Sequence, residues 1–112
     1  MKKLILFFTL LTIILTGCEN QVGGEYFFEH VDQLEHSIDK LEWDKISTQA
    51  EELKSMYKDN KWKIQLLGDE DEYESLHESI NNLIAAAKEK DSTSARLELA
   101  VVKSILEDVY SL

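Results

Sequence analysis

The stretch FFEHVDQLEHSIDKL, residues 27–41, decides the fold class. Its apolar residues recur at alternating steps of four and three, at Phe27, Val31, Leu34, Ile38 and Leu41. This spacing places the five side chains on one face of an α-helix, with the polar residues on the opposite face. We therefore expect an amphipathic helix from about Glu25 to Leu41 that packs its apolar face against other helices.

Three further stretches repeat this pattern, each time with its phase shifted. The second, from Trp43 to Leu67, contains Trp43, Ile46, Ala50, Leu53, Tyr57, Ile64 and Leu67, with Asn60 as a polar exception. The third contains Tyr73, Leu76, Ile80, Leu83 and Ala87, and the last contains Ala95, Leu99, Val102, Leu106 and Val109. Because one helix keeps one phase, each shift predicts a break between helices.

The breaks coincide with residues that end or begin helices. The first falls near residues 40–44, and the second falls at Gly68 and Asp69. Asp69 can cap the next helix, and Glu72 stands where the partner in a capping box would stand. The third break contains Asp91, Ser92 and Thr93, all of which are favourable N-cap residues.

Four amphipathic helices with short connections predict an all-α protein with an up-and-down four-helix bundle. The alternative is a pair of helical hairpins that completes its core by dimerising. Residues 34–38 (LEHSI) resemble residues 76–80 (LHESI), which indicates either a duplicated hairpin or a chance match between heptad patterns. The expected core contains Leu34, Ile38, Leu53, Tyr57, Leu76, Ile80, Leu83, Leu99, Val102 and Leu106.

The N-terminal region has the pattern of a lipoprotein signal peptide. Lys2 and Lys3 precede an apolar run of 12 residues, 4–15, which as a helix would span about 18 Å and is too short for a bilayer of about 30 Å. Leu15, Thr16 and Gly17 then precede Cys18, the sole cysteine, as in a lipobox. We expect cleavage of residues 1–17, a lipid on Cys18, a linker at 18–24 and a helical domain at 25–112. The alternative is an ordinary secretory signal with a chance cysteine.

The chain is acidic, with 22 Asp and Glu residues against 12 Lys and Arg residues. This charge argues against nucleic acid as a partner, because nucleic-acid binding depends on basic residues that neutralise phosphates. It also argues that acyl chains rather than charge hold the protein at the extracytoplasmic face of the cell membrane. A single cysteine excludes a disulfide within the chain.

Several features resemble a family of small bacterial proteins, domain of unknown function 4363. They are Trp43 at the start of the second helix, Tyr57-Lys58, Leu66-Leu67 followed by an acidic turn, and Lys90-Asp91 before the last helix. The resemblance implies helical envelope proteins, often lipoproteins and mostly from Gram-positive bacteria. It implies no activity.

The residues do not predict catalysis or a cofactor. The acidic cluster at 69–74 lacks the glycine and the final glutamate of an EF-hand loop, and Glu74 and His77 form a single Glu-x-x-His where dimetal bundles use two. His30 and His36 are expected at the surface. The serines lack a plausible base, and there is no glycine-rich phosphate loop. We therefore expect neither an enzyme nor a metal site.

Two functions remain. The first is a non-catalytic lipoprotein whose bundle binds or positions another envelope or membrane component. The alternative is a lipoprotein that binds a small ligand or a divalent cation through the acidic turn at 69–74.

One surface near the end of the second helix favours the first function. Trp62 and Leu66 lie off the apolar face, and Lys58, Lys61 and Lys63 surround them. Aromatic side chains beside lysines favour contact with lipid headgroups. We expect these residues to contact the membrane or a membrane-protein partner. The alternative is that Trp62 packs against the linker or the first helix.

Overall fold

The computed structural model describes residues 24–111, and all regular structure in this range is α-helical. The helices are α2 (Gly24–Asp39), α3 (Trp43–Asp59), α4 (Lys61–Leu67), α5 (Glu70–Lys88) and α6 (Ser92–Val109). The prediction of an all-α protein is therefore confirmed.

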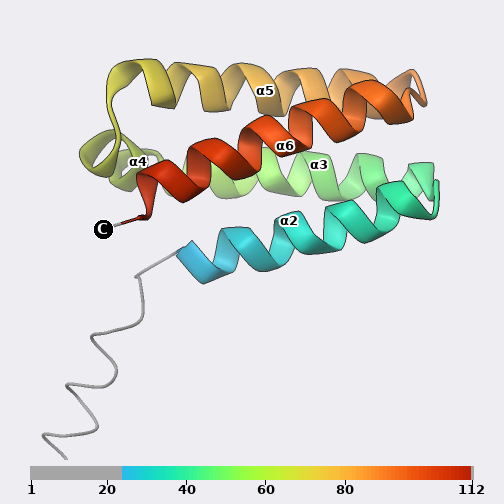
Figure 1. Ribbon diagram of the computed structural model, residues 1–112, viewed down its shortest axis with the longest axis horizontal. Coiled ribbons are helices and arrows are strands. Elements are labelled where there is room, and N and C mark those ends of the chain that lie inside the picture. The colour runs from blue at the N-terminus through green and yellow to red at the C-terminus, as the bar shows by residue number, and fades with distance from the viewer. Residues whose placement is uncertain (1–23, 112) are drawn as a thin grey trace, which may run out of the picture.

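The four long helices lie side by side and run alternately in opposite directions (Figure 1). Helix α2 packs against α3 and α6, and α5 also packs against α3 and α6. Each long helix thus has two long neighbours. The short helix α4 lies between α3 and α5 in the chain and contacts both.

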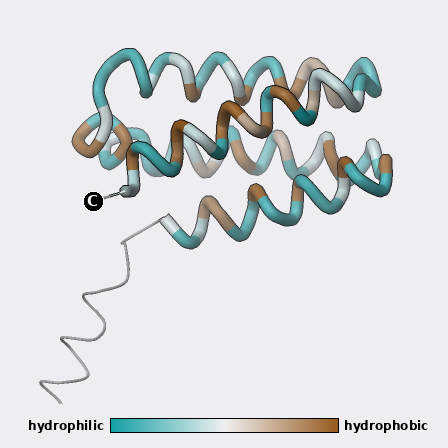
Figure 2. Tube along the Cα trace, viewed as in Figure 1, coloured by the Kyte–Doolittle hydropathy of each residue, from teal (hydrophilic) through white to brown (hydrophobic). Residues whose placement is uncertain are grey.

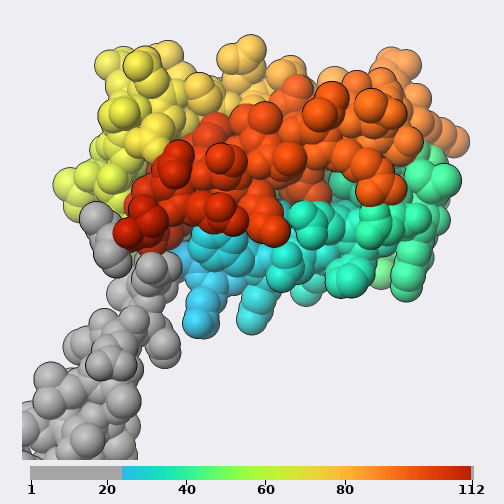
Figure 3. All heavy atoms as spheres, in the orientation of Figure 1, coloured from blue at the N-terminus to red at the C-terminus, as the bar shows by residue number. Residues whose placement is uncertain are grey.

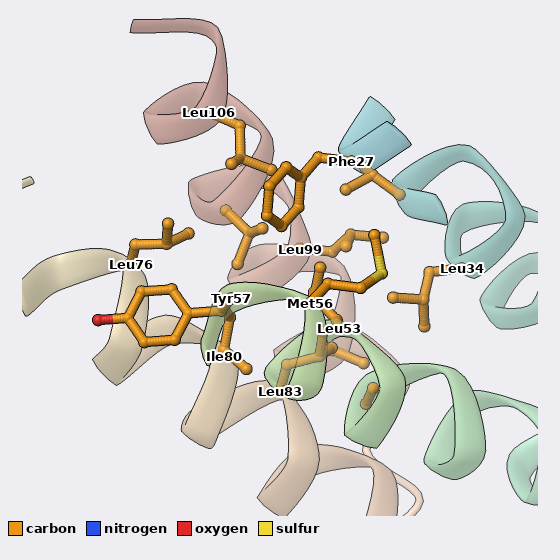
Figure 4. Close-up of a cluster of buried hydrophobic side chains, with 14 of the residues drawn as sticks. Phe27, Leu34, Leu53, Met56, Tyr57, Leu76, Ile80, Leu83, Leu99 and Leu106 are labelled. Carbon is orange, nitrogen blue, oxygen red and sulfur yellow. The ribbon is translucent and has the colours of Figure 1, made fainter. Parts of the chain in front are cut away.

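The apolar faces of the four long helices meet in one core. All ten residues of the expected core are buried in a single cluster, together with residues such as Phe27, Met56 and Ile64. In Figure 4, labelled members of this cluster from α2, α3, α5 and α6 point toward one another, among them Phe27, Leu53 and Leu99. The alternation of four and three therefore identified the buried faces correctly, because it keeps side chains in one stripe along a helix.

Two three-residue connections, 40–42 and 89–91, turn the chain in the same way. Leu41 and Lys90 have φ values of 55° and 54°. The amide of Leu41 donates to the Ile38 carbonyl and that of Glu42 to the Ser37 carbonyl, which is the Schellman pattern. We expected Leu41 on the apolar face of the first helix. That prediction is wrong, because Leu41 lies beyond the helix in this turn and is 53% exposed.

The two predicted N-caps are confirmed. Asp69 accepts a hydrogen bond from the Glu72 amide at 2.8 Å, and Glu72 accepts one from the Asp69 amide at 3.2 Å, which completes the capping box. Asp91 accepts a hydrogen bond from the Ser94 amide at the start of α6.

The expected single helix over 43–67 is wrong, because the chain breaks at Asn60 into α3 and α4. The side-chain amide of Asn60 donates to the Met56 carbonyl at 2.8 Å. Such local side-chain bonds compete with the regular helical ladder. The polar exception in the apolar pattern therefore marks the end of α3.

The expectation that His30 lies at the surface is also wrong. His30 is 9% exposed, and its Nε2 lies 2.7 Å from the Gln49 carbonyl oxygen of α3. A hydrogen bond to this carbonyl satisfies the buried imidazole and joins α2 to α3. His36 is exposed, as expected.

The hairpins α2–α3 and α5–α6 have the same pattern of buried positions, 49 residues apart. Phe27 corresponds to Leu76, Leu34 to Leu83, Ala50 to Leu99 and Leu53 to Val102, and all eight are buried. The left-handed residues Leu41 and Lys90 are separated by the same interval. The resemblance between residues 34–38 and 76–80 does not follow this correspondence, since it is shifted by one heptad.

Candidate functional site

The expected lipidation site lies outside the described residues. Cys18 and the preceding Leu15, Thr16 and Gly17 come before Gly24, where the described chain begins. The expected signal peptide and most of the expected linker also lie outside the described residues. The described residues therefore show only where the chain from Cys18 enters the helical domain, at the start of α2.

The start of α2, the end of α6 and helix α4 lie at one end of the molecule (Figure 1). A Cβ atom on Gly68, directly after α4, would lie 3.0 Å from a side-chain atom of Val109 at the end of α6. The ring of Tyr110 lies 5.9 Å from that of Phe27 on α2. Both rings are buried, so they close the core at this end.

Helix α4 buries one face and exposes the other. Ile64 is fully buried and Leu67 packs against the core, whereas Trp62 is 62% exposed and Leu66 is 76% exposed. Residues four apart lie on the same side of a helix, so Trp62 and Leu66 form one outward face. Figure 2 shows the hydrophobic residues of α4 at the end of the molecule, and Figure 3 shows this helix beside the end of α6. Trp62 thus does not pack into the core.

Three lysines lie close to this outward face in the sequence: Lys61 and Lys63 flank Trp62 in α4, and Lys58 lies in the last turn of α3. Lys58 and Lys61 are exposed and Lys63 is half-buried. The Lys63 ammonium lies 5.4 Å from the centre of the Trp62 ring, which is within the range of a cation–π interaction. Within residues 24–111, none of these three lysines has a carboxylate within 4.0 Å. Of the predicted contact residues, the structure thus brings Lys63 to Trp62, whereas Lys61 contacts Tyr73.

Aromatic rings stack between α3 and α5, and Lys61 joins α4 to them. The Lys61 ammonium lies 5.6 Å from the centre of the Tyr73 ring, which stacks on Tyr57 at 5.4 Å. The ring of His77, one turn after Tyr73 on α5, also stacks on Tyr57, with centroids 5.3 Å apart. These contacts hold the start of α4 against α3 and α5.

The environment shifts the pKa values of the two tyrosines in opposite directions. Burial, assisted by Tyr73, raises the pKa of Tyr57 far above its usual value. The neighbouring Lys61 lowers the pKa of Tyr73, since a cation favours the phenolate, and the hydrogen bond from Tyr57 acts in the same direction.

The acidic turn at 69–74 serves first as a helix start. Asp69 and Glu72 accept hydrogen bonds from each other's backbone amides, and Glu70 and Asp71 occupy the first turn of α5, where the helix dipole favours negative charge. Within the described part of the chain, no group of three or more His, Cys, Asp or Glu residues is arranged to hold a metal ion. His77 and Glu74 belong to no such group.

Sequence reasoning missed a second exposed apolar pair. Leu97 is 63% exposed and Val101, one turn later on α6, is also exposed. Both lie off the apolar seam of the last helix. Their position outside the seam is the sequence feature that could have identified this exposed pair.

Among the helices of residues 24–111, none combines the length and the apolar character needed to cross a bilayer.

Comparison with known proteins identifies one family. The model of the family described as Domain of unknown function (DUF4363) matches residues 24–112. No curated protein matches the chain, and no solved structure does. The matched region covers all the described helices.

Proposed function

The chain belongs to the family described as Domain of unknown function (DUF4363), and we propose that it is a non-catalytic lipoprotein of the cell envelope. Its helical domain binds or positions another envelope or membrane component. Cys18 carries the lipid that anchors it to the extracytoplasmic face of the membrane. The support for the anchor is the stretch Leu15-Thr16-Gly17-Cys18 after a short apolar run.

The scaffold is an up-and-down four-helix bundle with α4 inserted between its second and third helices. The support is that each long helix packs against two others, and that consecutive long helices run in opposite directions. Short connections between antiparallel neighbours are typical of this architecture. A rigid bundle of this kind holds the residues at its ends in fixed positions.

The observation that carries the proposal is the outward face of α4, at the end where the chain from Cys18 enters. Trp62 and Leu66 are large apolar residues left exposed there, and the Lys63 ammonium lies beside the Trp62 ring. Exposed apolar residues of this size that cluster together indicate a contact surface. The anchor and the contact surface then act at the same end of the bundle.

The anchor is tested by the substitution Cys18→Ala in the full chain. Wild-type protein should partition with membranes and into the detergent phase, whereas the variant should remain in the aqueous phase. Membrane association that is unchanged by Cys18→Ala would contradict the lipid anchor.

The contact surface is tested by placing a photo-crosslinking residue at position 62 in native membranes. Position 78 on α5 is the control, because Glu78 is exposed and polar and lies outside α4. We expect crosslinked products from position 62 and none from position 78. Equal crosslinking at both positions, or none at position 62, would show that α4 is not the contact surface.

A further inference from the structure

The fold does not require α4. The connections 40–42 and 89–91 each turn the chain between neighbouring antiparallel helices with three residues. The connection from α3 to α5 joins neighbours of the same kind, yet it runs from Asn60 to Asp69 and contains a helix. The additional residues therefore call for an explanation beyond closing the bundle.

The outward face of α4 combines apolar residues with neighbouring lysines, and this combination is typical of helices at a membrane interface. Trp62 and Leu66 present apolar surface, while the lysines beside them present positive charge. Tryptophan is enriched at the level of the lipid headgroups, and lysines near an anionic surface are attracted to it. Tyr26, in the first turn of α2, adds a second exposed aromatic residue at this end.

The three lysines in and next to α4 are positively charged, whereas the whole chain has a net negative charge. Lys58, Lys61 and Lys63 have no carboxylate partner in the described part of a protein that has 22 acidic and 12 basic residues. The carboxylates at the start of α5 oppose attraction to anionic lipid. Two of them, Asp69 and Glu72, accept hydrogen bonds from backbone amides, which offsets part of their charge.

The length of the chain before α2 places α4 near the lipid. From Cys18 to Gly24 an extended chain reaches about 20 Å, and Gly24 lies at the same end of the molecule as α4. An acyl chain on Cys18 thus holds this end within reach of the headgroups. The opposite end, with Leu41 and Trp43, points away from the bilayer.

We infer that α4 is an interfacial helix that lays Trp62 and Leu66 among the headgroups of an anionic bilayer, with Lys58, Lys61 and Lys63 facing lipid phosphates. The bundle then stands on its α4 end. This inference rests on the proposed lipid anchor and names the bilayer itself as the component that α4 contacts.

The two tryptophans of the chain make the test internally controlled. Trp43 begins α3 at the opposite end of the bundle from Trp62. The lipidated full-length product is reconstituted into protein-free vesicles of phosphatidylglycerol and phosphatidylcholine, with bromine on the acyl chains as a quencher. The variant Trp43→Phe reports on Trp62 alone, and Trp62→Phe reports on Trp43 alone. We expect blue-shifted, quenched emission from Trp62 and unquenched emission from Trp43.

The role of charge is tested with two matched triple variants in the Trp43→Phe background. Lys58→Gln, Lys61→Gln and Lys63→Gln together should reduce the quenching of Trp62. Lys40→Gln, Lys45→Gln and Lys90→Gln remove the same charge from exposed positions at the other end and should leave the quenching unchanged. Equal effects of both triple variants would overturn the assigned role of the three lysines.

The outcome for the anchor is separate from the outcome for α4. Cys18→Ala fractionation reports on the anchor alone, whereas quenching reports on the position of α4. An anchored protein whose Trp62 is unquenched overturns the interfacial helix and leaves the lipoprotein proposal intact. If position 62 then crosslinks to a protein in native membranes, α4 faces a protein partner.

Discussion

Asp91 stabilises α6 through two hydrogen bonds to the same residue. Its carboxylate accepts from the Ser94 amide at 3.1 Å and from the Ser94 hydroxyl at 2.7 Å. Both hydrogen bonds favour the charged carboxylate and therefore lower the pKa of Asp91 below its usual value. The bond from the hydroxyl has the larger effect, and the bond from the amide has the smaller one. The cap is thus linked to pH.

The substitution Asp91→Asn tests this link. Asn can still cap α6 but does not titrate. Because the folded-state pKa is depressed, the stabilisation from the Asp91 charge is present above its usual value of 3.8 and is lost as pH falls through the folded-state pKa. The difference in melting temperature between wild type and Asp91→Asn should therefore shrink below about pH 4.

The control for this measurement is Asp32→Asn, at an exposed position on α2 outside the helix caps. Its difference from wild type should change less over the same pH range. A wild-type advantage over Asp91→Asn that grows toward low pH would contradict the assigned cap.

At the scale of the helices, periodicity predicted the buried faces but not every boundary. The seam from Trp43 to Leu67 keeps its phase through Asn60, so only the polar side chain signalled a break there. The bond from Asn60 to Met56 that ends α3 depends on a rotamer, which no periodicity encodes. Likewise, His30 is buried where α2 packs close enough to α3 for its imidazole to reach the Gln49 carbonyl. Periodicity within one helix does not encode this distance between two helices.

The exposure of two candidate-site residues was predictable from the sequence, but their geometry was not. Trp62 and Leu66 fall off the apolar seam, and the structure leaves both exposed. The separate helix that carries them and the cation–π contact from Lys63 depend on the break at Asn60 and on side-chain packing. Sequence spacing therefore identified an unpartnered face without showing how it is presented.

The packing of α3 gives a prediction about stability. Leu53 is fully buried in the centre of the core. Leu53→Ala should lower the free energy of unfolding by about 2–5 kcal/mol, since it removes buried methyl groups and leaves a cavity. Thermal or denaturant unfolding measures this change.

The matched control is Leu97→Ala, which makes the same chemical change at an exposed position on α6. Exposed substitutions usually stay within about 0.5 kcal/mol. A Leu53→Ala variant as stable as Leu97→Ala would show that the core is packed differently.

At the scale of the whole molecule, attraction between helices acts against a large excess of negative charge. Arg96 pairs with Asp39, and Lys103 lies 3.8 Å from Glu35, so both pairs join α6 to α2. All four side chains are substantially exposed, and exposed ion pairs contribute only about 0–1 kcal/mol each. The formal net charge of −10 repels itself throughout the compact state.

This balance predicts that salt stabilises the folded chain. Raising NaCl from about 10 mM to about 150 mM shortens the Debye length from about 30 Å to about 8 Å, which screens long-range repulsion more than close contacts. The melting temperature should therefore rise over this range. Glu51→Gln, Glu78→Gln and Glu107→Gln together remove three exposed negative charges from the middle or outer turns of three helices, so the variant should show a smaller rise. A melting temperature that falls with salt would mean that the ion pairs between α2 and α6 outweigh the repulsion, which would contradict the weak contribution assigned to them.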